Sequence, residues 1–239
     1  MGLVYGRAAG VRAATAKYVT FLDADDAFYD DHILELALDE AEKNNADVVH
    51  FKEFRFFIKQ GKWQTEVYEW ANPVNYGVTS GMKQIYDSYL HGANGSTMHG
   101  KLIRTDTYKK AIELVGEDII NAHIFYNEDM LMMGAIYLCT QTYVGLNKTG
   151  YSYYYHPTNS MTQSRNSLDL ALRRQKHTIM AYKRILELYP TQTHAAIRRN
   201  FVQSIAYQIV VTSKFMSAKD NVILCNNYLK SGIMTQEQT

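Results

Sequence analysis

The feature that most constrains this chain is a group of three aspartates, Asp23, Asp25 and Asp26, directly after the apolar residues 18–22. The apolar stretch has the composition of a buried strand, so the aspartates lie where that strand enters a loop. Like charges this close together raise one another's pKa unless a cation neutralises them. Carboxylate oxygens suit Mg²⁺ or Mn²⁺, and Mg²⁺ usually takes one or two carboxylates together with substrate phosphates. The pattern predicts a divalent-metal site, with an acidic strand-to-helix loop as the alternative.

The segments after this loop alternate between helical and strand patterns. Residues 31–44 carry apolar side chains at helical spacing, and Asp30 or Asp31 is placed to cap that helix. Residues 47–51 form the next buried-strand pattern. A strand, a helix and a strand at this spacing indicate a βαβ unit, so we expect strands 18–22 and 47–51 to be parallel neighbours.

The rest of the chain changes from mixed to purely helical patterns near residue 165. The predicted elements are a hairpin 53–59 and 62–68 around Gln60-Gly61, a loop 72–80, helices 82–90, 105–114 (with Thr105 as N-cap) and 127–138, a strand pair 142–146 and 151–155 around Asn147-Lys148, and helices of about 168–188, 193–216 and on to 229. We therefore expect an α/β domain over residues 1–165 and a helical C-terminal extension over residues 166–239.

Composition narrows the classes of function. The formal net charge of +1 on 239 residues gives no electrostatic basis for binding nucleic acid. The two cysteines, Cys139 and Cys225, lie far apart and fit a reduced, intracellular protein. No apolar run is long enough to span a bilayer, and the first residues lack a signal-peptide pattern. We expect a cytoplasmic protein, and peripheral contact with the inner face of the membrane stays open.

Four segments, in this order along the chain, resemble the family 2 glycosyltransferases of the GT-A fold. They are Gly6-Arg7-Ala8-Ala9-Gly10-Val11 with Lys17-Tyr18-Val19-Thr20-Phe21-Leu22-Asp23-Ala24-Asp25-Asp26, then His99-Gly100-Lys101-Leu102-Ile103-Arg104, then Tyr126-Asn127-Glu128-Asp129, and finally Tyr153-Tyr154-Tyr155-His156 with Ser160-Met161-Thr162. The resemblance implies a GT-A-like (Rossmann-like) mixed sheet. It also implies inverting transfer of a sugar from a nucleotide-diphosphate-sugar donor to a saccharide or lipid-linked acceptor, in the synthesis of bacterial surface polysaccharide.

The resemblance further implies a Mn²⁺ or Mg²⁺ cofactor. Asp25 is then the first metal ligand, and Asp23 lies beside it toward the donor ribose and diphosphate. His156 is a further candidate for the metal or diphosphate, with a partly buried strand-end histidine as the alternative. A metal would neutralise the charge of the leaving diphosphate.

The acceptor hydroxyl must lose a proton during attack, which calls for a carboxylate as general base. Asp129 is the candidate base and Glu128 its orienting neighbour, with simple capping of a helix N-terminus as the alternative. Arg7 matches a family position near the donor. Lys101 is placed to contact phosphate or Asp129. The alternative for both cations is an exposed side chain.

The chain also departs from the family pattern. Ala8, Ala16 and Gly100 stand where the family has Asn, Gly and Asn, and only residues 1–22 precede Asp23, where the GT-A fold normally has a nucleotide-binding half. We therefore expect an N-terminally truncated fold, and a homo-oligomer formed through the exposed edge of strand 18–22.

Two other functions compete with glycosyl transfer. One is a non-catalytic, truncated module that binds carbohydrate or a partner chain. The other is a phosphatase of the haloacid dehalogenase type, which also places Asp-x-Asp after an apolar strand. That family has Thr or Val at the position of Ala27, which argues against it.

Overall fold

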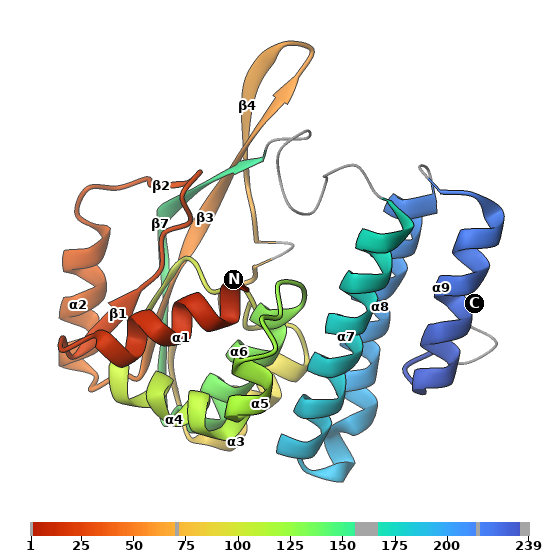
Figure 1. Cartoon of the computed structure of the whole chain (residues 1–239). Helices are drawn as coiled ribbons and strands as arrows, with labels where there is room; N and C mark the ends of the chain where they lie inside the picture. The colour runs from red at the N-terminus through yellow and green to blue at the C-terminus, as the bar shows by residue number, and fades with distance from the viewer. Residues whose placement is uncertain (1, 70–71, 156–166, 214–215, 235–239) are drawn as a thin grey trace.

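The computed structural model describes residues 2–69, 72–155, 167–213 and 216–234 (Figure 1). A curved sheet carries helices on both faces, and three long helices stand beside it (Figure 1). The elements in the first part are α1 (Leu3–Ala13), β1 (Tyr18–Thr20), β2 (Ala27–Phe28), α2 (Ile33–Lys43), β3 (Val48–Lys59), β4 (Lys62–Val67), β5 (Gly77–Ser80), α3 (Met82–Leu90), β6 (Lys101–Arg104), α4 (Thr105–Val115), α5 (Glu117–Ile120), α6 (Glu128–Cys139) and β7 (Thr142–Tyr155). The second part holds α7 (Leu168–Leu188), the 3₁₀ turn η1 (Thr191–Thr193), α8 (His194–Ser213) and α9 (Ala218–Ser231).

The sheet is mixed, as predicted. Its strand order is β1-β6-β3-β7-β2, with β4 paired to β3 and β5 paired to β7. β3 and β7 are parallel, and the other pairs are antiparallel. The predicted α/β class with a helical C-terminal part is therefore confirmed.

The predicted βαβ neighbours are the first correction. β1 and β3 run in the same direction, but β6 lies between them: Ile103 pairs with Val19 on one side and with Val48 on the other. A strand from a later part of the chain thus separates two strands that are close in sequence. Among the described strands β1 pairs with β6 alone, and the predicted oligomer through its other edge stays a prediction.

The predicted strand pair around Asn147 and Lys148 is wrong. β7 is one continuous strand of 14 residues. Opposite β3, Leu146 pairs with Phe51 and Thr149 with Lys52, so the two polar residues form an irregularity within the strand and not a turn. Both of their side chains are exposed, which explains why the local sequence resembles a turn.

Several elements were not predicted, among them β5 and α1. The expected loop 72–80 contains β5, which pairs with the first residues of β7. The first residues of the chain form α1, whose buried side chains Val4, Ala8 and Val11 recur at helical spacing. Glycines at positions 2, 6 and 10 mask this helix in the sequence.

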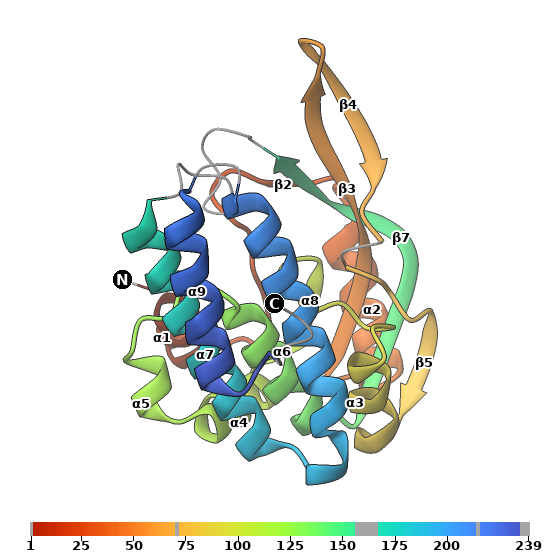
Figure 2. The same cartoon turned by 90° about the vertical axis from the view of Figure 1, so that its right-hand side faces the viewer.

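Local predictions made from turn and helix signals were more accurate. The β3–β4 hairpin turns at Gln60 and Gly61, both with positive φ, and projects from the body (Figure 2). The bounds of α3 and α7 agree with the predictions. The caps differ: His32 occupies the N-cap position of α2, and its backbone N–H donates to Asp30 at 2.8 Å. Thr105 is not the N-cap of α4, because its hydroxyl donates to the carbonyl of Ala16.

Two apolar clusters fill the two sides of the sheet. The smaller one packs α2 against the sheet through residues such as Ile33, Val49 and Phe51. The larger one joins α1, α3, α4 and α6 on the opposite face, and it continues into α7 and α8 through Ile185 and Phe201. The C-terminal helices are therefore anchored in the same core as the α/β part, and the proposed boundary at residue 165 lies outside the described residues.

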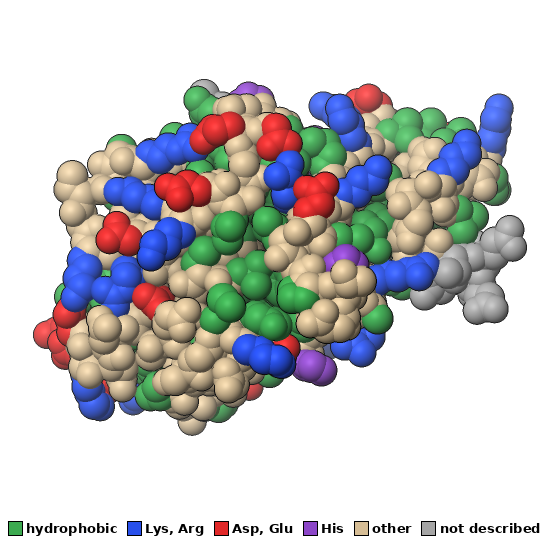
Figure 3. Space-filling view, turned by 90° about the horizontal axis from the view of Figure 1, so that it is seen from below, with side chains coloured by type: hydrophobic (Ala, Val, Ile, Leu, Met, Phe, Trp, Pro, Cys, Tyr) green, Lys and Arg blue, Asp and Glu red, His purple; other side chains and the backbone are tan. Residues whose placement is uncertain are grey.

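Figure 3 shows acidic and basic side chains interspersed on one face of the molecule. Surface pairs such as Arg12–Glu117 and Arg184–Asp118 belong to this mixed pattern of charge. Within the described ranges, every helix is too short or too polar to cross a membrane.

Candidate active site

One arginine gathers three of the predicted site residues. Arg7, on α1, forms ion pairs with Asp129, with Asp23 at 3.2 Å and with Glu128 at 3.6 Å. Asp23 follows β1, and the two other carboxylates stand in the first turn of α6. We call these four side chains the Arg7 cluster. Segments separated by up to 122 residues thus meet at one point.

The Arg7 cluster is buried at one end and open at the other. The exposed fraction of the side chain rises from 8% for Glu128 to 27% for Asp129 and 37% for Asp23. Asp129 and Asp23 therefore combine a guanidinium partner with access to a ligand.

Three carboxylates share one guanidinium, so their charge is only partly neutralised. Burial alone would lower the pKa of Arg7, but Asp129, Asp23 and Glu128 together raise it. Burial and the neighbouring Asp129 raise the pKa of Glu128 well above its usual range. The geometry therefore favours a proton on Glu128, which leaves Asp129 as the better exposed carboxylate of the pair.

The other two aspartates of the loop differ sharply. Asp26 accepts hydrogen bonds from the Tyr151 hydroxyl and the Tyr154 backbone N–H, both at 2.8 Å, and so ties the loop to β7. Burial raises the pKa of Asp26, although these two bonds oppose the shift. Asp25 is exposed and has no hydrogen-bond partner among the described residues.

The donor set fits a hard divalent cation that a substrate helps to hold. In the parts of the chain that the structure describes, no group of three or more His, Cys, Asp and Glu side chains forms a metal cage. An exposed Asp25 next to a half-exposed Asp23 matches Mg²⁺, which binds through one or two carboxylates and substrate phosphates. His156, the third predicted ligand, lies outside the described residues.

Lys101 lies in a different environment from the one predicted. Its side chain is fully buried, and its ammonium donates to the carbonyl of Thr97 at 2.8 Å and to Asn72 at 3.3 Å. Burial lowers the pKa of Lys101 to about 8, against the opposing effect of nearby Glu53. The structure thus turns this side chain inward, away from solvent.

Buried polar side chains around Lys101 complete a second cluster. Glu53 accepts from Asn72 at 2.8 Å and contacts His99 at 2.5 Å. His99 also stacks on Tyr151, with ring centroids 4.8 Å apart. We call Lys101, Glu53, Asn72 and His99 the Lys101 cluster. Sequence reasoning missed Glu53 and Asn72, because a lone charge in a strand and a loop amide give no local signal.

Gly100 explains one departure from the family pattern. Its φ is +69°, and a Cβ there would lie 2.5 Å from a carboxylate oxygen of Glu53. Any side chain at this position would disrupt the Lys101 cluster.

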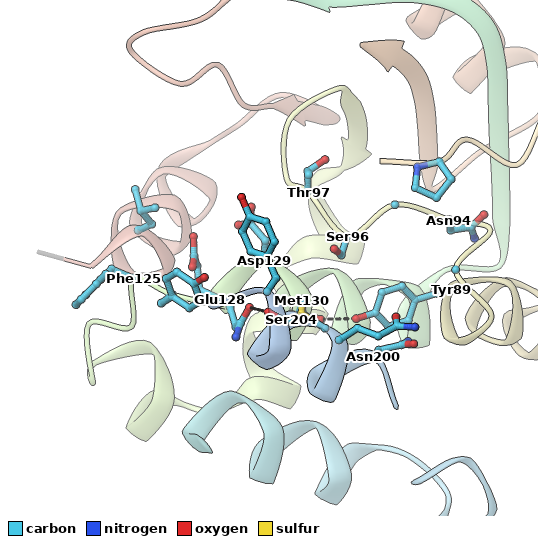
Figure 4. Close-up of a pocket in the computed structure, with 18 residues that line it drawn as sticks. Tyr89, Asn94, Ser96, Thr97, Phe125, Glu128, Asp129, Met130, Asn200 and Ser204 are labelled. Carbon is cyan, nitrogen blue, oxygen red and sulfur yellow. Dashed lines mark hydrogen bonds between the residues drawn. The ribbon is translucent and has the colours of Figure 1, made fainter. Parts of the chain in front are cut away.

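A cavity of about 750 Å³ opens beside the Arg7 cluster. Glu128 and Asp129 line it between Phe125 on one side and Asn94 on the other (Figure 4). Ser96 and Thr97, from the loop before β6, form one wall. The opposite wall comes from α8 and includes Asn200, Gln203, Ser204 and Tyr207. No local pattern of residues predicts this contribution, because it depends on how α8 packs.

A buried carboxyl group with a raised pKa in the lining of a cavity, such as Glu128, is typical of an enzyme active site. Residues 1–104 match the model of glycosyl transferase family 2, a span that includes Arg7 and all three aspartates of the loop. This part of the chain is thus similar to that family, and the match supports glycosyl transfer as the class of reaction. The predicted family resemblance and enzyme class are confirmed.

Two other comparisons concern solved structures and curated proteins. The crystal structure of S. aureus TarS residues 1–349 is 15% identical to this chain, with a TM-score of 0.43. The match covers 97% of this chain and 69% of that one. No curated protein matches the chain.

Proposed function

We propose that this protein transfers a sugar from a nucleotide-diphosphate-sugar donor to a saccharide or lipid-linked acceptor, with inversion at the anomeric carbon, in surface polysaccharide synthesis. The observation that carries the proposal is the Arg7 cluster, in which one guanidinium joins the aspartate loop to the two carboxylates of α6. A donor held by the loop and an acceptor in the cavity would meet at this cluster.

Asp129 acts as the general base. It takes the proton from the acceptor hydroxyl as that oxygen attacks the anomeric carbon and the diphosphate leaves. Its exposure and its place in the lining of the cavity bring it within reach of a hydroxyl there. Glu128, which is more deeply buried and favours its protonated form, positions Asp129 and does not compete with it for the proton.

Arg7 orients the two sides of the reaction. One nitrogen of its guanidinium donates to Asp129 and the other to Asp23. The aspartate loop that holds the donor and the general base therefore keep a fixed position relative to each other. Asp25 and Asp23 would hold Mn²⁺ or Mg²⁺, which when bound supplies positive charge for the leaving diphosphate. Lys101, which is fully buried, supports the cavity wall through its hydrogen bond to Thr97 and does not contact the donor.

Calorimetric titration tests this proposal. We expect UDP-glucose or UDP-N-acetylglucosamine to bind the full chain in Mn²⁺, and we expect chelator or Asp25→Ala to abolish binding. Asp31→Ala is the matched control, since Asp31 is exposed and follows the same loop. If folded protein gives no heat with either donor, the non-catalytic carbohydrate- or partner-binding module replaces the enzyme as the better account.

A further inference from the structure

One face of α8 forms a wall of the cavity over two helical turns. Asn200, Gln203, Ser204 and Tyr207 are spaced at i, i+3, i+4 and i+7, the spacing of one helical face. Ile197, Phe201 and Ile205 on another face are buried in the core. The helix is thus fixed on its apolar side and presents polar side chains to the cavity.

The charged side chains that line the cavity are acidic. Its lining combines amide, hydroxyl and aromatic side chains, and its charged members are both acidic, Glu128 and Asp129. In the part of the chain that the structure describes, neither lysine nor arginine lines the cavity. The nearby guanidinium of Arg7 is already shared by three carboxylates, so it does not offer a free positive charge to a ligand.

We propose that this cavity binds an uncharged saccharide as the acceptor, and that the polar face of α8 selects it; this inference rests on the proposed glycosyl transfer. Amide and hydroxyl groups bond sugar hydroxyls, and aromatic rings pack against the apolar faces of sugar rings. A uronate or phosphate unit would meet the negative charge of Asp129, and among the described residues that line the cavity no lysine or arginine would balance it.

Gln203 and Tyr207 are the residues that test the proposal best. Both side chains are exposed, and neither has a hydrogen-bond partner among the described residues. Asn200 and Ser204 are less suitable, because they bond to the carbonyl of Leu90 and to Asn127 and so help to hold α8 in place. Substitution of Gln203 or Tyr207 therefore changes the cavity without breaking a described hydrogen bond.

The experiment is saturation-transfer NMR on the full chain without donor. The probes are cellobiose, chitobiose and lactose as neutral disaccharides, and digalacturonate as an anionic one. We expect at least one neutral disaccharide to bind and digalacturonate to bind at least about tenfold more weakly. Tyr207→Ala should weaken the neutral sugar by about tenfold, since it removes one stacking surface.

A change of charge gives the sharper test. Gln203→Lys should reduce the difference between neutral and anionic probes, whereas Ala206→Lys, also exposed on α8 but outside the cavity lining, should leave it unchanged. Tighter binding of digalacturonate by the unmodified chain would overturn the proposal. So would equal effects of the two lysine variants, or no binding of any neutral probe.

Donor hydrolysis without acceptor separates this inference from the proposed function. Release of UDP from UDP-glucose or UDP-N-acetylglucosamine reports the donor side alone. If donor is hydrolysed but digalacturonate is preferred in the cavity, only the acceptor inference fails. If neutral sugars bind as expected but neither donor binds nor turns over, glycosyl transfer fails, and the cavity remains a binding site for neutral saccharides.

Discussion

The Arg7 cluster and the Lys101 cluster are built from similar parts but differ in access to ligands. Each combines buried carboxylate and cationic side chains, and Thr97 lies between them: it lines the cavity and accepts a hydrogen bond from Lys101. The Arg7 cluster opens to the cavity through Asp129, whereas Lys101 is fully buried. We infer that the open cluster performs the chemistry and the closed one supports the wall beside it.

The comparison shows that a charged residue in a family-like segment does not by itself indicate contact with substrate. Asp129 and Lys101 both lie in segments that resemble the family, yet one side chain reaches the cavity and the other points into the core. Their burial and their partners separate the two roles. Variants of each cluster should therefore fail in different ways.

The largest effect is expected for Asp129→Asn. Loss of the base should lower the rate of transfer by about 10²–10⁴-fold, while the fold is retained because Arg7 keeps two carboxylate partners. Initial rates of UDP release with acceptor present measure it. Glu128→Gln is the matched control, and it should cost much less activity because Glu128 already favours its protonated form. Equal losses in the two variants would contradict the assignment of Asp129 as base.

Substitutions in the Lys101 cluster should lower the stability of the fold. Lys101→Met removes the donor for Thr97 and Asn72 and takes a positive charge away from the buried Glu53, so the free energy of unfolding should fall by about 3 kcal/mol. Urea unfolding followed by circular dichroism measures the change. Lys110→Met, an exposed lysine on α4, should have little effect. An unfolding free energy unchanged by Lys101→Met would mean that the cluster does not support the fold.

Arg7→Lys tests whether geometry or charge alone organises the open cluster. Lysine keeps the positive charge but cannot bond Asp23 and Asp129 through two fixed nitrogens, so kcat should fall by about tenfold or more. The thermal unfolding temperature should change little by comparison. Turnover equal to that of the unmodified chain would show that charge alone is sufficient.

The smallest expected effect is a dependence of the unfolding free energy on pH, which comes from Lys101. The pKa of Lys101 is about 8 in the folded protein and 10.5 when exposed, so between these values the unfolded chain binds more protons. This residue therefore makes the unfolding free energy rise as pH increases from 8 toward 10.5, and its contribution is lost as pH falls through 8. The difference in unfolding free energy between the unmodified chain and Lys101→Met should grow over pH 8–10. A constant difference would contradict the lowered pKa.

The sequence predicted the locally determined parts of the fold well. The β3–β4 hairpin depends on Gln60 and Gly61, and helix α7 on a long apolar periodicity, so neighbouring residues suffice to define them. The insertion of β6 between β1 and β3 depends on pairing between distant segments. β7 was missed as one strand because Asn147 and Lys148 look like a turn, and only the partner strand shows that they bulge outward.

The site was predicted in composition but not in arrangement. The motif residues Asp23, Glu128 and Asp129 do come together, yet the ion pairs with Arg7 that join them span up to 122 positions in the chain. The inward direction of Lys101 follows from the neighbours it bonds, which no local pattern reveals. The wall from α8 likewise depends on how the C-terminal helices pack on α6.

Turnover per folded molecule in Asp129→Asn and Lys101→Met, measured side by side, tests the central claim most directly. The fraction folded comes from the unfolding curves, and the rate from UDP release in Mn²⁺ with UDP-glucose or UDP-N-acetylglucosamine and an acceptor. The account predicts that Asp129→Asn is folded but nearly inactive, whereas each folded molecule of Lys101→Met turns over at close to the unmodified rate. A stable Lys101→Met that is inactive, or an Asp129→Asn that remains active, would contradict it.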